Sequence, residues 1–176
     1  VVAHHNTYDG HPDAYPMHIL AKILSDGQSA RIYRRLVYDQ QVAVSAFGAG
    51  PIIEDPNLFY AVAVVQPGQS TEAAAEALIA ELDRAKAEPP TDQEIQRAKN
   101  QFARDYVIGR ISNSDKASHL AHAHVIHDDI TTADGELDIF LNVSKADVQR
   151  VAQTYLRDDN RLVMTILPRG SGAGRR

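Results

Sequence analysis

Histidine is the residue type in this chain with the widest chemical use, because imidazole binds zinc, copper, nickel and iron. Four of the eight histidines lie in the segment SHLAHAHVIHDD, at residues 118–129. On a helix, His119 and His122 share one face, His127 lies nearby and His124 points well away. No pair has the i, i+4 spacing with an intervening glutamate that forms a zinc-binding helix. We interpret the segment as a polar helix face, with metal binding by residues 119–127 as the alternative.

Other recognisable chemistry is missing from the sequence. It contains no cysteine, which excludes thiolate zinc sites, disulfides and cysteine nucleophiles. It also lacks the G-x-S-x-G motif of serine hydrolases and the glycine-rich loops that bind phosphate. The acidic pairs Asp128–Asp129 and Asp158–Asp159 are adjacent in sequence, so their side chains point in different directions and suit caps or turns. The chain therefore has no recognisable active site of its own.

Composition predicts one soluble domain. The 176 residues are 44% hydrophobic and 23% charged, and the length suits a single buried core. The net charge of −5 and the acidic isoelectric point argue against nucleic acid as a partner. Arg31, Arg34 and Arg35 form the one tight basic cluster, which we expect to be a solvated helix face. No apolar run approaches the ~20 residues that span a bilayer, so no membrane span is expected.

The first half of the chain predicts strands and helices in alternation. Val1–Ala3 resemble the end of a β-strand, and a helix begins near Pro12 and ends at Asp26–Gly27. Ser29 is expected to cap a second helix that runs to about Gln40. The β-branched and aromatic runs at 42–50 and 58–66 predict two adjacent antiparallel strands.

The second half predicts mainly helices. One opens at Ser70 or Thr71, and Thr91 with Glu94 forms a capping box before a helix of about 20 residues. Further helices are expected at 113–127 and 133–141. Ser144 with Asp147 is expected to open the last helix, through Tyr155, and a strand follows at 161–168. This pattern predicts an α+β fold, with helices on one face of a small antiparallel sheet. Residues 1–168 form one domain in this interpretation, and 169–176 a flexible tail.

Three segments resemble the pitrilysin/insulinase family of zinc peptidases. The segment LAKILSDGQSARIYRRLVYDQQVAVSAFGAG is similar to the family pattern L-G-G-G-x-S-S-R-L-Y-x-x-L-R-E-x-x-G-L-A-Y-S-V, ungapped from Ser25 through Ala46. Downstream, EALIAELDRAKAEPPTDQEIQRAKNQF and VSKADVQRVAQTYLRDDNR resemble two later family motifs in the same order. The resemblance therefore covers nearly the whole chain.

The resemblance implies an architecture of two similar α+β domains. One binds zinc through an H-x-x-E-H helix, and the other closes a clamshell chamber. This sequence has no H-x-x-E-H, so no cofactor is expected here and zinc would belong to the upstream domain of a parent chain. Active family members supply an arginine and a tyrosine from the second domain, and the matching positions here are Val37 and Val44. Valine has no hydrogen-bond donor, so we predict that these two residues face the substrate chamber without a catalytic role.

The resemblance also predicts function and partners. We expect the inactive C-terminal domain of a zinc metalloendopeptidase, which closes the substrate chamber and mediates domain or subunit assembly. Its expected partners are the upstream zinc-binding domain, a homologous Arg/Tyr-bearing subunit and peptide substrate. The alternative is a non-proteolytic scaffold subunit of a peptidase-like complex. The resemblance favours the bacterial periplasm or the cytoplasm as the compartment.

Overall fold

The computed structural model describes residues 1–168. Its centre is an antiparallel sheet in the order β2-β3-β1-β4. The strands are β1 (Val2–His5), β2 (Ala43–Ala49), β3 (Leu58–Val65) and β4 (Arg161–Val163). The predicted neighbours at 42–50 and 58–66 do pair antiparallel, with Phe47 opposite Val62. The first strand of the chain lies between β3 and β4, so the sheet joins the two ends of the domain.

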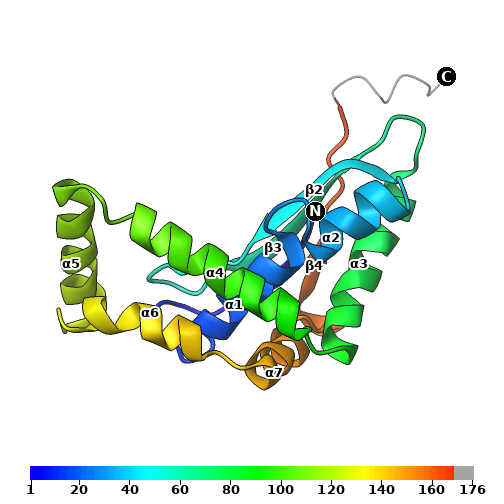
Figure 1. Cartoon of the computed structure of the whole chain (residues 1–176). Coiled ribbons are helices and arrows are strands. Elements are labelled where there is room, and N and C mark those ends of the chain that lie inside the picture. The colour runs from blue at the N-terminus through cyan, green and yellow to red at the C-terminus, as the bar shows by residue number, and fades with distance from the viewer. Residues whose placement is uncertain (169–176) are drawn as a thin grey trace.

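Helices make up most of the remaining chain (Figure 1). The long helices are α1 (Ala14–Ser25), α3 (Thr71–Ala87), α4 (Asp92–Ile108), α5 (Asn113–His127), α6 (Thr132–Asn142) and α7 (Lys145–Tyr155). A short α2 (Arg31–Tyr33) continues into η1 (Arg34–Asp39), a π-helical segment, and a 3₁₀ turn, η2 (Asp158–Asn160), precedes β4. The α+β class and the order of elements agree with the prediction from the sequence.

Side-chain caps explain most of the helix starts. The predicted capping boxes are present: Thr91 Oγ accepts from the backbone N–H of Glu94, and Ser144 Oγ accepts from that of Asp147. Each satisfies a helix N–H that has no partner within the helix. The prediction for Ser29 was wrong. Ala30 occupies the cap of α2 without a side-chain bond, because Ser29 instead accepts from Arg97 through its Oγ and its carbonyl oxygen.

The helices lie on one face of the sheet, as expected. Helix α1 contacts β2, and α3 contacts β3 and β1, while α4, α6 and α7 pack against α1. Figure 1 shows α4 crossing over α1, with α5 and α6 together at the end of the molecule farthest from β2. The core lies between sheet and helices and is filled by fully buried side chains, among them Met17, Leu24, Leu36, Phe59 and Leu78.

The other face of the sheet is apolar and uncovered by the described helices. Residues paired across neighbouring antiparallel strands point to the same face, and alternate residues of β3 share it. This rule and the strand register place six side chains together, which we call the open sheet face: Phe47, Leu58, Tyr60, Val62, Val64 and Leu162. All except Val62 are exposed.

The structure corrects the predicted end of the last strand and does not test the predicted end of the domain. The final strand ends at Val163 rather than at residue 168, although Met164 still exchanges backbone hydrogen bonds with Val1. The predicted tail, 169–176, lies outside the described residues, and the boundary of the domain at 168 stays a prediction. Within the described part of the chain, no helix has the length and hydrophobicity to cross a membrane.

Candidate functional site

Val37 and Val44 lie on different elements. Val37 is in η1, half-buried and packed against the core. Val44 is in β2, at a register shift between Ala43 and Ser45, and 51% of it is exposed. Such a shift is a β-bulge, which turns a side chain away from the regular pleat. Neither valine can donate a hydrogen bond to a peptide. Their predicted place in a substrate chamber is untested.

Arg31 and Tyr38 are seven residues apart, as Val37 and Val44 are, but they do not form a pair. The Arg31 guanidinium makes two hydrogen bonds to the Glu94 carboxylate, at 2.6 and 2.8 Å. Tyr38 is exposed, and its hydroxyl donates to Gln28 Oε1 at 3.4 Å. The sequence predicted that the basic cluster Arg31, Arg34 and Arg35 is exposed to solvent. This prediction was wrong for Arg31, whose side chain is only 8% exposed, and right for Arg34 and Arg35.

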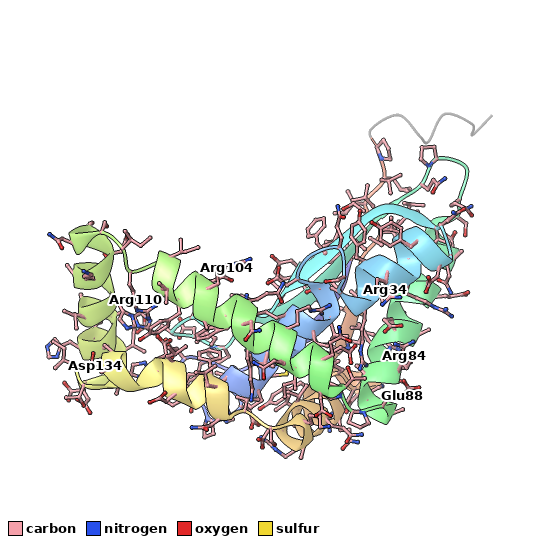
Figure 2. The ribbon with its side chains drawn as sticks, in the orientation of Figure 1. Arg34, Arg84, Glu88, Arg104, Arg110 and Asp134 are labelled. Carbon is pink, nitrogen blue, oxygen red and sulfur yellow. The ribbon has the colours of Figure 1, made fainter. Side chains whose placement is uncertain are left out.

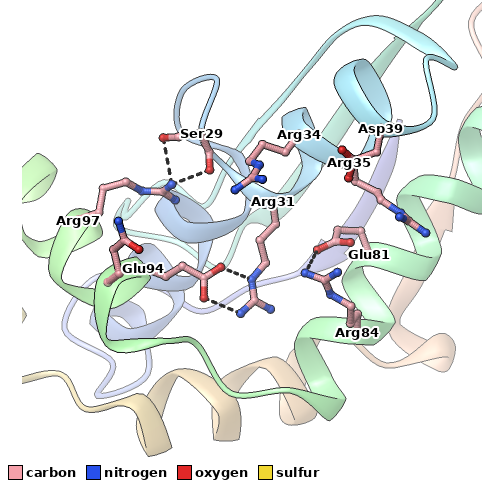
Figure 3. A pocket seen from close by; sticks show the side chains of 10 residues that line it. Ser29, Arg31, Arg34, Arg35, Asp39, Glu81, Arg84, Glu94 and Arg97 are labelled. Atoms are coloured by element: carbon pink, nitrogen blue, oxygen red, sulfur yellow. Dashed lines mark hydrogen bonds and ion pairs between the residues drawn. The ribbon is translucent and has the colours of Figure 1, made fainter.

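A polar hollow surrounds this ion pair (Figure 3). It has a volume of about 520 Å³ and lies between η1, α3 and α4. Figure 3 shows Arg31 directed at Glu94, Arg84 at Glu81 and Arg97 at Ser29. Its lining residues are Ser29, Arg31, Arg34, Arg35, Asp39, Glu81, Arg84, Gln93, Glu94 and Arg97.

The pKa values of the two glutamates in this hollow are shifted in opposite directions. The bidentate bond from Arg31 lowers the pKa of Glu94 to about 2, so Glu94 is ionised at neutral pH. Burial raises the pKa of Glu81, which is 2% exposed, and Arg84 at 3.2 Å opposes that shift. A buried glutamate with a raised pKa is a candidate acid or base. Here Glu81 pairs with Arg84 of its own helix, α3, and lies in the same hollow as the Arg31–Glu94 pair that joins α2 to α4, so we assign it a structural role.

The histidines of α5 divide into separate environments. Arg110 lies between α4 and α5 (Figure 2). Its Nη2 atom is 2.8 Å from His119 Nδ1 and 2.7 Å from Glu136 Oε2. Its guanidinium carbon lies 3.3 Å above the Tyr106 ring, a cation–π contact. His119 Nε2 lies 3.1 Å from the Ala133 carbonyl oxygen. His119 is therefore a connector between α4, α5 and α6.

His122 and His127 face a carboxylate that sequence reasoning did not associate with them. His122 Nε2 lies 3.0 Å from Asp9 Oδ2, and His127 Nε2 lies 3.4 Å from Asp9 Oδ1. His124 is exposed, as its helical angle predicted. Asp9 precedes α5 by more than one hundred residues, and its one sequence signal was the turn-forming pair Asp9–Gly10.

The fold and the motifs together indicate the class of protein. The fold is a helix-covered antiparallel sheet with the family motifs in order. The chain has no H-x-x-E-H, and the positions predicted to match the family arginine and tyrosine are Val37 and Val44. The residues present do not fit the catalytic zinc of the family, so no peptidase step can be assigned to them. The class is that of a peptidase-like domain that lacks the zinc-binding helix motif.

Comparison with known proteins identifies the family. Residues 2–102, more than half of the chain, match the model of the Peptidase M16 inactive domain. The chain belongs to this family, as the resemblance of its motifs to zinc peptidases predicted.

Named relatives are zinc proteases. The zinc protease PqqE of Helicobacter pylori is 25% identical over 158 residues, which is 90% of this chain and 35% of that protein. The chain thus spans about a third of the length of this curated relative. A candidate zinc protease from Bordetella pertussis is 26% identical, with a TM-score of 0.80 over 92% of this chain and 88% of that one. An inactive peptidase domain from Bordetella parapertussis gives the same identity and TM-score.

One more distant neighbour shows the fold alone. A chain in the structure of complex III from Candida albicans is 14% identical, with a TM-score of 0.76 over 92% of this chain. The same fold therefore occurs in chains of very different sequence.

Proposed function

We propose that this chain is the non-catalytic domain of a zinc endopeptidase and that it closes the substrate chamber by packing against a zinc-bearing domain of the same polypeptide. The observation that carries the proposal is the open sheet face. Five exposed apolar side chains, on β2, β3 and β4, lie on this one face. Contiguous apolar surfaces of this kind mark interaction sites in soluble proteins.

The occupant is argued from length and chemistry. About two thirds of the Helicobacter pylori relative lies outside the match to this chain, which leaves ample chain for a second domain of similar size. Zinc bound in such a domain would lower the pKa of a water molecule that attacks the peptide carbonyl. This chain would contribute a wall of the chamber. Val37 and Val44 would face peptide there without donating hydrogen bonds, and a homologous subunit would bring the missing arginine and tyrosine.

The test is peptide hydrolysis by this chain and by its parent protein. A mixed library of internally quenched peptides would be incubated with the 176-residue chain, with the parent, and with the parent plus an Arg/Tyr-bearing homologous subunit. We expect no hydrolysis by the chain alone. We expect hydrolysis in one of the parent samples, lost with a chelator and restored by zinc.

Two outcomes would contradict the proposal. Hydrolysis by the 176-residue chain alone would show that the domain has its own active centre. Chelator-resistant hydrolysis, or none in either parent sample, would refute the zinc endopeptidase and favour the non-proteolytic scaffold.

A further inference from the structure

Asp9, His122 and His127 form a compact cluster outside the hollow described above. Their ligand atoms all lie within 4.8 Å of one another. For a tetrahedral metal with bonds of about 2.0–2.2 Å, neighbouring ligand atoms lie roughly 3.3–3.6 Å apart. The two imidazoles approach different oxygens of Asp9, with His122 Nε2 3.0 Å from Oδ2 and His127 Nε2 3.4 Å from Oδ1, so the three groups converge on one space.

The carboxylate of the cluster is held in place by its backbone. Asp9 and Gly10 form a turn in which the His11 N–H donates to the Tyr8 carbonyl oxygen at 3.2 Å, with Gly10 at φ +85°. Only glycine adopts that φ readily. The Asp9 N–H also donates to the Ile53 carbonyl oxygen at 2.8 Å. These bonds hold the backbone from which the carboxylate projects.

Asp9 is a buried carboxylate whose ion-pair partners are imidazoles. Its side chain is 5% exposed, whereas most acidic clusters are solvated. Within residues 1–168 it forms ion pairs with the two imidazoles and with no arginine or lysine. A buried carboxylate needs a compensating charge or full hydrogen bonding. A divalent metal ion would supply that charge at a point where both imidazoles can also bind it.

The cluster is open on one side. The His122 side chain is 46% exposed, and a hollow of about 110 Å³ adjoins both imidazoles. Tyr15, Glu136 and Ile139 contribute to its lining. Three protein ligands with an accessible fourth position give the coordination that zinc adopts when it also binds water.

We propose that Asp9, His122 and His127 bind one divalent transition-metal ion of the zinc type. The site would join the turn after β1 to the end of α5, and so would hold the α5–α6 end of the domain against its centre. It is separate from any H-x-x-E-H centre and does not depend on the protease role. It reverses the interpretation of residues 119–127 as a simple polar face.

The experiment uses the 176-residue chain without an affinity tag, because a histidine tag binds metal itself. After dialysis against a chelator, ZnCl₂ would be titrated by calorimetry and CoCl₂ by visible absorption. We expect one Zn²⁺ per chain and Co²⁺ bands of the intensity that four- or five-coordinate sites give. His122→Ala and Asp9→Asn should each weaken zinc binding at least ten-fold, and zinc should raise the Tm of the unaltered chain.

His124→Ala is the matched control, since His124 lies on the same helix and is exposed. It should bind zinc as the unaltered chain does. Asp9→Asn retains the size of the side chain, and circular dichroism would verify that each variant folds. The proposal is overturned if the chain binds no zinc at a defined stoichiometry, or if His124→Ala weakens binding as much as His122→Ala does.

Discussion

His4 is a buried histidine with no hydrogen-bond partner for either ring nitrogen within residues 1–168. It lies in the centre of the sheet, 1% exposed, beside Phe59. Burial lowers its pKa to about 4, and the positive charges of Arg161 and Lys86 add to that effect. The ring is therefore neutral in the folded protein at neutral pH and acts as a core side chain.

The first prediction concerns the pH dependence of stability. The pKa of His4 in the folded chain, about 4, is below that of an unfolded histidine, about 6.5. Between these values the unfolded state binds the proton first, so folding stability falls as pH drops from 6.5 to 4. His4→Leu should make the free energy of unfolding in urea less dependent on pH across this window. His5→Leu, on the neighbouring exposed residue, is the control.

The prediction fails if His4→Leu and the unaltered chain lose equal stability between pH 6.5 and 4.

Glu94 affects the pH dependence of stability at lower pH. With its pKa lowered from 4.5 to about 2, its contribution is present above pH 4.5 and is lost as pH falls through 2. The two groups can therefore be distinguished by where stability is lost.

At the scale of elements, close backbone contacts decide how β2 and β3 pair. A Cβ atom at Gly48 would overlap the carbonyl oxygen of Tyr60 on the facing strand. The obstacle is backbone rather than a flexible side chain, so the strands would have to separate. Gln41, just before β2, adopts φ 53°, at the position where the family pattern has glycine.

The second prediction is that Gly48→Ala destabilises the chain by about 1–3 kcal/mol or more, the range for overpacking. Gly135→Ala is the matched control, because nothing lies within 4 Å of its Cβ position in α6. Alanine in a helix interior is favoured over glycine by roughly 0.5–1 kcal/mol. Urea unfolding should thus show opposite signs for the two variants, and equal signs would contradict this account of β2–β3 pairing.

The elements also show how far sequence reasoning reaches. Thr91, Glu94, Ser144 and Asp147 were recognised because capping is local: both partners lie within one turn of chain. The predicted start of α2 was wrong because the Ser29 hydroxyl accepts a hydrogen bond from Arg97, a residue distant in sequence, and does not cap the helix. The π-helical segment η1 had no signal in a pattern read at 3.6 residues per turn.

The whole molecule brings together residues that no local pattern connects. Helical angles grouped His119 with His122, yet the fold directs His119 to Arg110 and His122 to Asp9. Val37 and Val44 were singled out only because they match the arginine and tyrosine positions of the family pattern. Two valines have no feature of their own that would mark them as functional positions. Asp9 was missed for the same reason as Arg97: its partners are distant in sequence, and only the packing of α5 against the first turn brings them close.

The third prediction concerns the open sheet face as a surface. Phe47 and Tyr60 are exposed, so replacing both by serine removes little packing from the folded chain. We expect the double variant of the 176-residue chain to keep its Tm within a few degrees and to self-associate less in size-exclusion chromatography with light scattering. Val125→Ser is the control, because Val125 is also exposed but lies on α5, away from the sheet.

In the parent protein the same double variant should have a second effect. If the face packs against the zinc-bearing domain, loss of two aromatic rings weakens that interface, since buried aromatic side chains dominate interface energetics. Limited proteolysis between the domains should become faster and peptide hydrolysis slower, while Val125→Ser changes neither. A double variant whose Tm falls sharply in the isolated chain, or whose parent resists proteolysis as before, would show that this face belongs to the fold and is no docking surface.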